Sequence, residues 1–289
     1  MEYYVSNLEL KDIFSVMNDY DAFLFDLWGV IIEGNTLYPG VVDNINKVLK
    51  QKKVFFVSNA PRSSVSSHEV ITSWGINATP KMVITSGEVA RQAIIASDTE
   101  LGIKHPVIYH LGADRNDYII NDLNYPTTTN IKEANILLLT IYRDENENLE
   151  EFDDLLEAAV KQGIVIICAN PDIIAPNHQV IRYCAGYFSA KIERFGGKVL
   201  YTGKPYSEIY NKVLNQLQHL PKDRILMIGD TFETDILGAN KVGIDSALVL
   251  TGNAKKYHIE YNDLDEKLVQ LKKAANKVNT DPSFVINIG

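Results

Sequence analysis

Short apolar runs alternate with longer amphipathic segments through the first third of this chain. Residues 22–25 and 53–57 are predicted to be buried strands, because short unbroken apolar runs are typical of strands covered on both faces. Between them, apolar side chains at helical spacing predict a helix over residues 41–50. A helix at 63–74 and a strand at 82–85 follow. This alternation predicts an α/β fold with a doubly wound parallel sheet.

The middle of the chain changes character before the first pattern returns. We interpret residues 86–198 as an inserted α/β domain, and residues 1–85 and 199–289 as a doubly wound, Rossmann-like core. Residues 8–17 are predicted to form a short amphipathic helix that leads into the first strand. Further strands and helices are predicted at residues 106–111, 136–140, 149–161, 164–169, 206–217, 224–228, 247–250 and 263–276.

Polar side chains stand where several of these predicted strands end. In open α/β sheets, ligands bind at the carboxyl ends of the strands. The carboxylates of Asp26, Asp230 and Asp235 are suited to a hard divalent cation such as Mg²⁺, which prefers oxygen ligands. The Ser58 hydroxyl and the Lys204 ammonium are suited to phosphate oxygens. Each residue alone also fits an ordinary cap, turn or surface position, so it is their order at successive strand ends that indicates a site.

Composition narrows the classes of partner. The chain has 289 residues, a formal net charge of -9 and a pI near 5.2, which argues against nucleic acid or an anionic membrane as the main partner. Cys168 and Cys184 lie in or near apolar runs and are expected to be reduced core residues, as in a cytoplasmic protein. The amino-terminal residues are polar and acidic, unlike a signal peptide, and no apolar run reaches transmembrane length.

Four segments together resemble the motifs of the haloacid dehalogenase (HAD) superfamily, class IIA. They read DLWGVIIEG, VFFVSNAPR, TGKP and MIGDTFETDILGANKVG, and the last is the most specific. ITSGEVARQAI resembles the entry to the class IIA cap domain, and ANPDI a cap strand that faces the active site. LVLTG closes the core as in the family. Members include 4-nitrophenylphosphatase-like and pyridoxal phosphatase-like enzymes, and the resemblance covers nearly the whole chain.

The resemblance implies a Mg²⁺-dependent hydrolase of small phosphomonoesters. Asp26 would be the nucleophile, and its carboxylate, the backbone carbonyl of Trp28 and the Asp230 carboxylate would be metal ligands. Asp235 would hold a metal-bound water or orient Lys204. Lys204 would pair with both the phosphate and Asp26, stabilising charge in the transition state.

The same resemblance implies where the rest of the substrate binds. Ser58 and the Asn59 amide would hold the phosphate, while Asp172, and with it Asn170, would reach the leaving group from the cap. The partner would be a small phosphorylated metabolite, whose identity would depend on cap loops around residues 172–179. Relatives often dimerise through the cap, so a homodimer is compatible with the resemblance.

One residue departs from the phosphatase pattern. These phosphatases carry a second aspartate two residues after the nucleophile, as general acid and base, and this chain has Trp28 there. A positioned acid or base contributes about 10²–10⁴-fold to a rate. Trp28 therefore predicts slow turnover, lost turnover or a substitute group, for which Glu33 is a candidate.

Two alternatives to a phosphatase stay open. One is a catalytically weak or inactive protein that binds a phosphorylated metabolite. The other is a haloacid dehalogenase-like hydrolase, because dehalogenases also carry an aromatic side chain at the Trp28 position. Against that second alternative, dehalogenases lack the acidic pair that is present here as Asp230 and Asp235.

Overall fold

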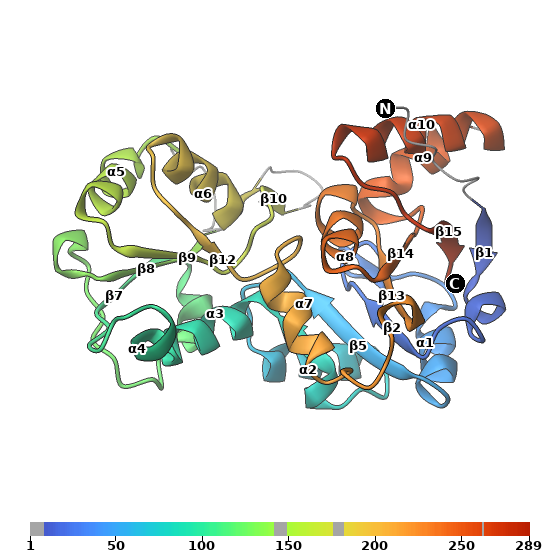
Figure 1. The fold of residues 1–289 in the computed structure, drawn as a ribbon, viewed down its shortest axis with the longest axis horizontal. Coiled ribbons are helices and arrows are strands. Elements are labelled where there is room, and N and C mark those ends of the chain that lie inside the picture. The colour runs from blue at the N-terminus through green and yellow to red at the C-terminus, as the bar shows by residue number, and fades with distance from the viewer. Residues whose placement is uncertain (1–8, 142–148, 176–181, 262) are drawn as a thin grey trace. The chain divides into compact units, whose positions relative to one another are not determined.

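The computed structural model describes residues 9–141, 149–175, 182–261 and 263–289 (Figure 1). The chain divides into two compact units. The first unit comprises Met1–Ser58, Ser67–Ile84 and Lys204–Gly289, and the second comprises Asn59–Ser66 and Thr85–Gly203. The predicted insertion at residues 86–198 falls within the second unit, and its proposed limits stay a prediction.

The first unit is built on a seven-stranded sheet, as the sequence predicted for the core. Its order is β1 (Leu10–Asp12), β15 (Phe284–Asn287), β14 (Asp245–Leu248), β13 (Ile225–Gly229), β2 (Ala22–Phe25), β5 (Lys53–Ser58) and β6 (Val83–Thr85). The pairs β1–β15, β15–β14, β14–β13, β13–β2 and β2–β5 are all parallel. Because parallel strands end at the same edge, the residues that follow β2, β5 and β13 are brought to one side of the sheet.

Apolar side chains alternate between the two faces of this sheet. In β15, Phe284 and Ile286 join the cluster that contains Ile45, while Val285 joins a second cluster that contains Leu271. The helical segments that lie wholly or mostly in this unit are α1 (Val41–Leu49), α2 (Ser64–Ser73), α7 (Ser207–Leu214), a π-helical turn (Phe232–Ile236), α8 (Leu237–Val242), α9 (Lys255–Ile259), α10 (Leu264–Lys277), and 3-10 turns at Ile13–Val16, Pro80–Met82, Lys222–Arg224 and Gly252–Ala254. A short hairpin joins β3 (Ile32–Glu33) to β4 (Thr36–Leu37).

The helix predicted over residues 8–17 is wrong for the part that the structure describes. Leu10–Asp12 form β1, and only Ile13–Val16 are helical, as a 3-10 turn. The reason is long-range: β1 pairs in parallel with β15, a C-terminal strand that the sequence analysis did not predict. Local apolar spacing carries no information about such a partner, and pairing with it overrides the local preference.

The second unit has its own parallel sheet, which the sequence anticipated as an α/β insertion. Its order is β12 (Leu200–Tyr201), β9 (Val165–Cys168), β8 (Ile136–Ile141) and β7 (Ile108–Gly112). One side is covered by α3 (Ser86–Ile95) and α4 (Ser97–Glu100), and the other by α5 (Asp153–Gln162) and α6 (Ala185–Arg194) (Figure 1). The unit also contains the hairpin β10 (Ile174–Ala175) and β11 (Arg182–Tyr183), and 3-10 turns at Asp114–Ile119 and Ile131–Glu133.

Both cysteines are buried in this second unit and form no disulfide, as expected. Burial raises the pKa of Cys168 to about 12, so its thiol stays protonated at neutral pH. No helix among the described residues is both long enough and apolar enough to cross a bilayer.

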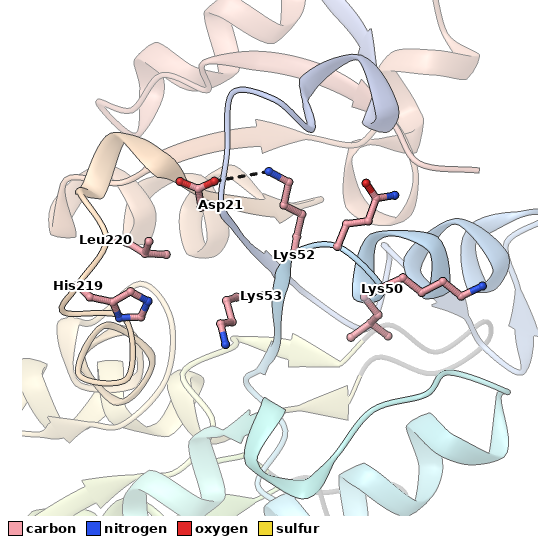
Figure 2. A pocket seen from close by; sticks show the side chains of 8 residues that line it. Asp21, Lys50, Lys52, Lys53, His219 and Leu220 are labelled. Carbon is pink, nitrogen blue, oxygen red and sulfur yellow. Dashed lines mark hydrogen bonds and ion pairs between the residues drawn. The ribbon is translucent and has the colours of Figure 1, made fainter.

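A cavity of about 390 Å³ opens in the first unit (Figure 2). Asp21 immediately precedes β2 and Lys53 begins β5, so the cavity lies at the ends of these strands opposite to Asp26 and Ser58. Figure 2 shows the Lys52 ammonium directed at Asp21, 3.5 Å away. The lining residues are Asp21, Leu49, Lys50, Gln51, Lys52, Lys53, His219 and Leu220. None of them is a candidate that the sequence motifs identified.

Candidate active site

Three buried aspartates meet at the carboxyl edge of the first unit's sheet. Asp26 follows β2, and its backbone N–H donates to the carbonyl of Ile228 at 3.0 Å, which sets it beside Asp230 at the end of β13. Asp235 comes from the π-helical turn after β13. One carboxylate oxygen from each aspartate lies within 4.8 Å of the other two. The sequence proposed these three as one cluster, and the structure brings them together.

Lys204 is buried among these carboxylates. Its side chain is 2% exposed, and its ammonium lies 2.7 Å from Oδ1 of Asp26 and 2.7 Å from Oδ1 of Asp235. Burial by itself would lower the pKa of Lys204, but attraction to Asp235 and Asp26 outweighs it, so the pKa is raised. Lys204 therefore stays a cation at any physiological pH.

The carboxylates carry more negative charge than Lys204 can balance. Burial raises the pKa of Asp26 well above its ordinary value, and the charges of Asp235 and Asp230 add to the effect while Lys204 opposes it. Burial, followed by the charge of Asp235, raises the pKa of Asp230 to about 7. A divalent cation would relieve this excess charge, and a set of carboxylate oxygens is what Mg²⁺ prefers. The residues present therefore fit that ion.

Hydrogen bonds fix both oxygens of Asp230. The Thr231 hydroxyl donates to Oδ1 at 3.0 Å, and the Asn253 backbone N–H donates to Oδ2 at 2.6 Å. Gly29 lies against the same carboxylate: it has a φ of +82°, and a Cβ added there would lie 2.2 Å from Oδ2. The glycine after Trp28 is thus needed both for its backbone conformation and for the space it leaves.

Trp28 is partly exposed to solvent, whereas Glu33 makes polar contacts with two other side chains. Trp28 is 41% exposed, which is unusual for a large aromatic residue in the loop that follows a buried strand. The Glu33 carboxylate lies 2.9 Å from the Lys255 ammonium and accepts a hydrogen bond of 3.2 Å from the Tyr38 hydroxyl. Glu33 is therefore already engaged by a cation and a hydroxyl donor.

The remaining predicted residues divide between the two units. Ser58 is the last residue of β5, the strand beside β2 in the first unit, and is 2% exposed. Asn59 and Asp172 belong to the second unit, where the Asn59 amide donates to Oδ1 of Asp172 at 2.8 Å. The side-chain oxygen of Asn170 accepts from the Asp172 backbone N–H at 3.2 Å. Of the loop at residues 172–179, positions 176–179 lie outside the described residues.

Several residues around the aspartates were missed by sequence reasoning. Thr231 and Asn253 bond to Asp230 or to each other, and the Tyr210 hydroxyl donates to the Asp235 backbone carbonyl at 3.1 Å. Burial raises the pKa of Tyr210 well above its ordinary value, so it remains a donor. Thr231 follows Asp230 directly and was open to inference, whereas Asn253 comes from a distant loop that only the fold brings close.

Comparison with known proteins decides the family. The profile of the haloacid dehalogenase-like hydrolases matches residues 20–243, and that of the HAD-hydrolase-like proteins matches residues 201–286. The chain belongs to the haloacid dehalogenase-like hydrolase family. The first profile spans the described aspartates and Lys204, the whole of the second unit and part of the first.

Relatives within this family cover nearly the whole chain. An acid sugar phosphatase from Staphylococcus epidermidis is 24% identical over an alignment length of 271 residues, and the match covers 89% of this chain and 100% of that protein. A hydrolase of the haloacid dehalogenase-like family from Brucella suis has a solved structure with a TM-score of 0.74 at 28% identity, covering 89% of this chain and 95% of that one. A possible sugar phosphatase from Cytophaga hutchinsonii gives 0.76 at 24% identity, with 97% and 98% covered. Both units therefore belong to the shared fold.

Proposed function

We propose that this protein is a Mg²⁺-dependent phosphatase that hydrolyses small phosphomonoesters through an aspartyl-phosphate. The observation that carries the proposal is the contact of 2.7 Å between Asp26 and Lys204 inside a buried cluster with Asp230 and Asp235. A nucleophilic carboxylate, a fixed cation and further carboxylates for a metal are the parts that phosphoryl transfer requires.

In the proposed reaction, an oxygen of Asp26 attacks the phosphorus atom of the substrate. A bond forms between that oxygen and phosphorus while the ester P–O bond breaks, and the leaving alkoxide takes up a proton. Water then attacks the phosphorus of the aspartyl-phosphate, loses a proton, and releases phosphate and the Asp26 carboxylate. Lys204 orients Asp26 and stabilises the charge on the phosphoryl oxygens. Ser58 and Asn59 are proposed to donate hydrogen bonds to those oxygens.

The cation would be held by carboxylate oxygens of Asp26 and Asp230 and by the Trp28 backbone carbonyl. Asp235 would hold a metal-bound water or orient Lys204, and its contact with the Lys204 ammonium supports the second role. When bound, Mg²⁺ would offset the negative charge that the carboxylates and a phosphate bring together.

The substrate class follows from the relatives and from the second unit. The acid sugar phosphatases are named for phosphorylated sugars, which supports a small phosphorylated metabolite as substrate here. Residues 86–198 are proposed to act as the cap, with Asp172 contacting the leaving group. The hydrogen bond from Asn59 supports this role, because it holds the Asp172 carboxylate in one orientation. Cytoplasmic location and a homodimer remain part of the proposal.

Trp28 favours a second candidate function. An indole cannot donate a proton to a leaving alkoxide as a carboxylic acid does, and Glu33 is engaged by Lys255 and Tyr38. The alternative is therefore a weakly active or inactive protein that retains metal and phosphate binding. A dehalogenase is less well supported, because attack on carbon by Asp26 gives no role to the clustered carboxylates of Asp230 and Asp235.

The deciding experiment is hydrolysis of 4-nitrophenyl phosphate with Mg²⁺ by the wild-type protein and by Asp26→Asn. This phenolate leaving group departs without protonation, so the assay does not depend on a general acid. We expect activity that the variant loses. Equal activity in the two proteins would reject Asp26 as the nucleophile, and inactivity of both with measurable metal binding would favour the binding protein.

A further inference from the structure

A continuous set of polar contacts leads from a lysine on α9 to the backbone beside Asp230. The Lys255 ammonium lies 2.9 Å from Oε2 of Glu33, and the Tyr38 hydroxyl donates to the same oxygen at 3.2 Å. The Tyr38 oxygen in turn accepts the backbone N–H of Gly252 at 3.0 Å. We call Glu33, Tyr38 and Lys255 the Tyr38 brace. All three belong to the first unit.

The backbone that the brace holds lies directly against Asp230. A Cβ added to Gly252 would lie 2.2 Å from Oδ2 of Asp230 and 2.4 Å from the Cα of Gly29, so there is no room for a side chain at this position. The next residue, Asn253, donates its backbone N–H to the same oxygen at 2.6 Å. The Thr251 hydroxyl donates to the carbonyl of Gly29. A shift of residues 251–253 would therefore move the Asp230 carboxylate.

The direction of the hydrogen bonds makes Tyr38 hard to replace. A phenol has one proton to give and lone pairs that accept. The Glu33 carboxylate only accepts, so Tyr38 donates to it, and the Tyr38 oxygen is then oriented to accept from Gly252. Phenylalanine at this position would keep the ring and remove both bonds.

We propose that Tyr38 and Glu33 are positioning residues that fix residues 251–253, so that Asp230 presents its carboxylate in one orientation to the divalent cation. This inference rests on the metal site of the proposed function. It also gives Glu33 a role other than that of a substitute acid or base. Groups that hydrogen-bond metal ligands from outside typically change metal affinity by about 10–100-fold when removed.

The test is the binding of Mn²⁺, used as a spectroscopic probe for Mg²⁺, to the full-length protein by electron paramagnetic resonance. We expect the dissociation constant to rise about 10-fold in Tyr38→Phe, the lower end of that range, because Tyr38 acts on Asp230 through residues 251–253. In Glu33→Gln the side chain keeps an acceptor for Tyr38 but loses its charge toward Lys255, so a smaller rise is expected. In Mg²⁺ titrations of phosphatase activity, half-saturation should shift upward while kcat at saturating Mg²⁺ stays near the wild-type value.

Tyr20→Phe is the matched control. The Tyr20 hydroxyl also donates to a carboxylate, Oδ2 of Asp245 at 2.6 Å, but it lies in the first unit at the opposite end of β2. It should lose stability without losing Mn²⁺ affinity. A Tyr38→Phe protein that binds Mn²⁺ like the wild type, or that loses kcat alone, would overturn the brace and leave the proposed function standing. A wild-type protein that binds no Mn²⁺ would overturn both.

Discussion

The ammonium of Lys204 lies 2.7 Å from Oδ1 of Asp26, and both side chains are largely removed from solvent. A buried ion pair is weak evidence for stability, because desolvation offsets much of the attraction. Removing one partner is different, since it leaves a buried charge without compensation. Here the loss would leave Asp235 as well as Asp26 without its cation.

We therefore expect Lys204→Met to lower the free energy of unfolding by about 3–5 kcal/mol and to reduce phosphatase activity by about 10²-fold or more. The loss of stability should be larger with a chelator than with Mg²⁺, because the metal would offset part of the unbalanced charge. Urea unfolding in both conditions measures this difference. Lys161→Met is the control: its ion pair with Glu157 has a similar distance, 2.9 Å, but is exposed and should contribute little.

Trp28→Asp restores a carboxyl group where the family's phosphatases have one. If proton transfer limits turnover, kcat for an alkyl phosphate should rise, by up to about 10²–10⁴-fold. Trp28→Asn is the control: asparagine is similar in size to aspartate but has no ionisable group, so it should bring no such gain. For 4-nitrophenyl phosphate the gain should be smaller, since its leaving group needs no proton. An unchanged kcat for alkyl phosphates would mean that another group already transfers the proton.

Much of the fold was predictable because it follows from the local pattern of apolar and polar residues. Unbroken apolar runs located β2, β5 and β13, and parallel topology alone implied that Asp26 and Asp230 would share an edge. The order of polar residues after predicted strands also indicated Lys204 and Asp235, whose roles the motifs then implied, although Lys204 lies in no strand of the seven-stranded sheet.

What the sequence did not predict depends on partners distant in the chain. Leu10–Asp12 form the strand β1 because they pair with the strand β15, from which they are separated by most of the chain. The Tyr38 hydroxyl accepts a hydrogen bond from the Gly252 backbone, and the Asn253 backbone donates one to Asp230. The path of residues 251–253, which makes both bonds possible, cannot be derived from periodicity. Glu33 was proposed as an acid or base from its position alone, and its pairing with Lys255, 222 residues further along the chain, is seen only in the folded protein.

His110 in the second unit predicts a dependence of stability on pH. Its ring contacts Asp117 at 2.6 Å through Nδ1 and Thr140 at 2.7 Å through Nε2. Burial lowers the pKa of His110, and the hydrogen bond and charge of Asp117 oppose this only in part. Because the unfolded chain then binds the proton more readily than the folded one, stability is highest above the ordinary histidine pKa of about 6.5 and falls as pH drops below it.

Thermal unfolding between pH 7.5 and 5.5 measures this effect. Over that range the melting temperature of the wild type should fall more than that of His110→Gln, whose side chain cannot take up the proton. His219→Gln, at an exposed histidine of the first unit, should behave like the wild type. If the melting temperature changed equally with pH in the wild type and in His110→Gln, protonation of His110 would not contribute to the pH dependence of stability.

Gly29 and Gly243 offer a matched pair that separates backbone strain from crowding at the metal site. Both have positive φ, +82° and +77°, so alanine at either position should cost about 1–2 kcal/mol. They differ in their surroundings. A Cβ on Gly29 would lie 2.2 Å from Oδ2 of Asp230, whereas the nearest atom to a Cβ on Gly243 is Cδ of Lys222 at 3.8 Å. Hydrogen bonds from Thr231 and Asn253 prevent Asp230 from moving aside without further loss.

We therefore expect Gly29→Ala to abolish Mn²⁺ binding and phosphatase activity and to lose more stability than Gly243→Ala, which should retain both and show only the cost of backbone strain. Urea unfolding gives the loss of stability in each variant, the loss in Gly243→Ala being that of backbone strain alone, and electron paramagnetic resonance gives the metal affinity of each variant. Full Mn²⁺ affinity in a folded Gly29→Ala protein would mean that Asp230 can leave its observed position without harm to the site. Asp230 would then not be a required ligand, and the metal would have to be held by Asp26 and Asp235 instead.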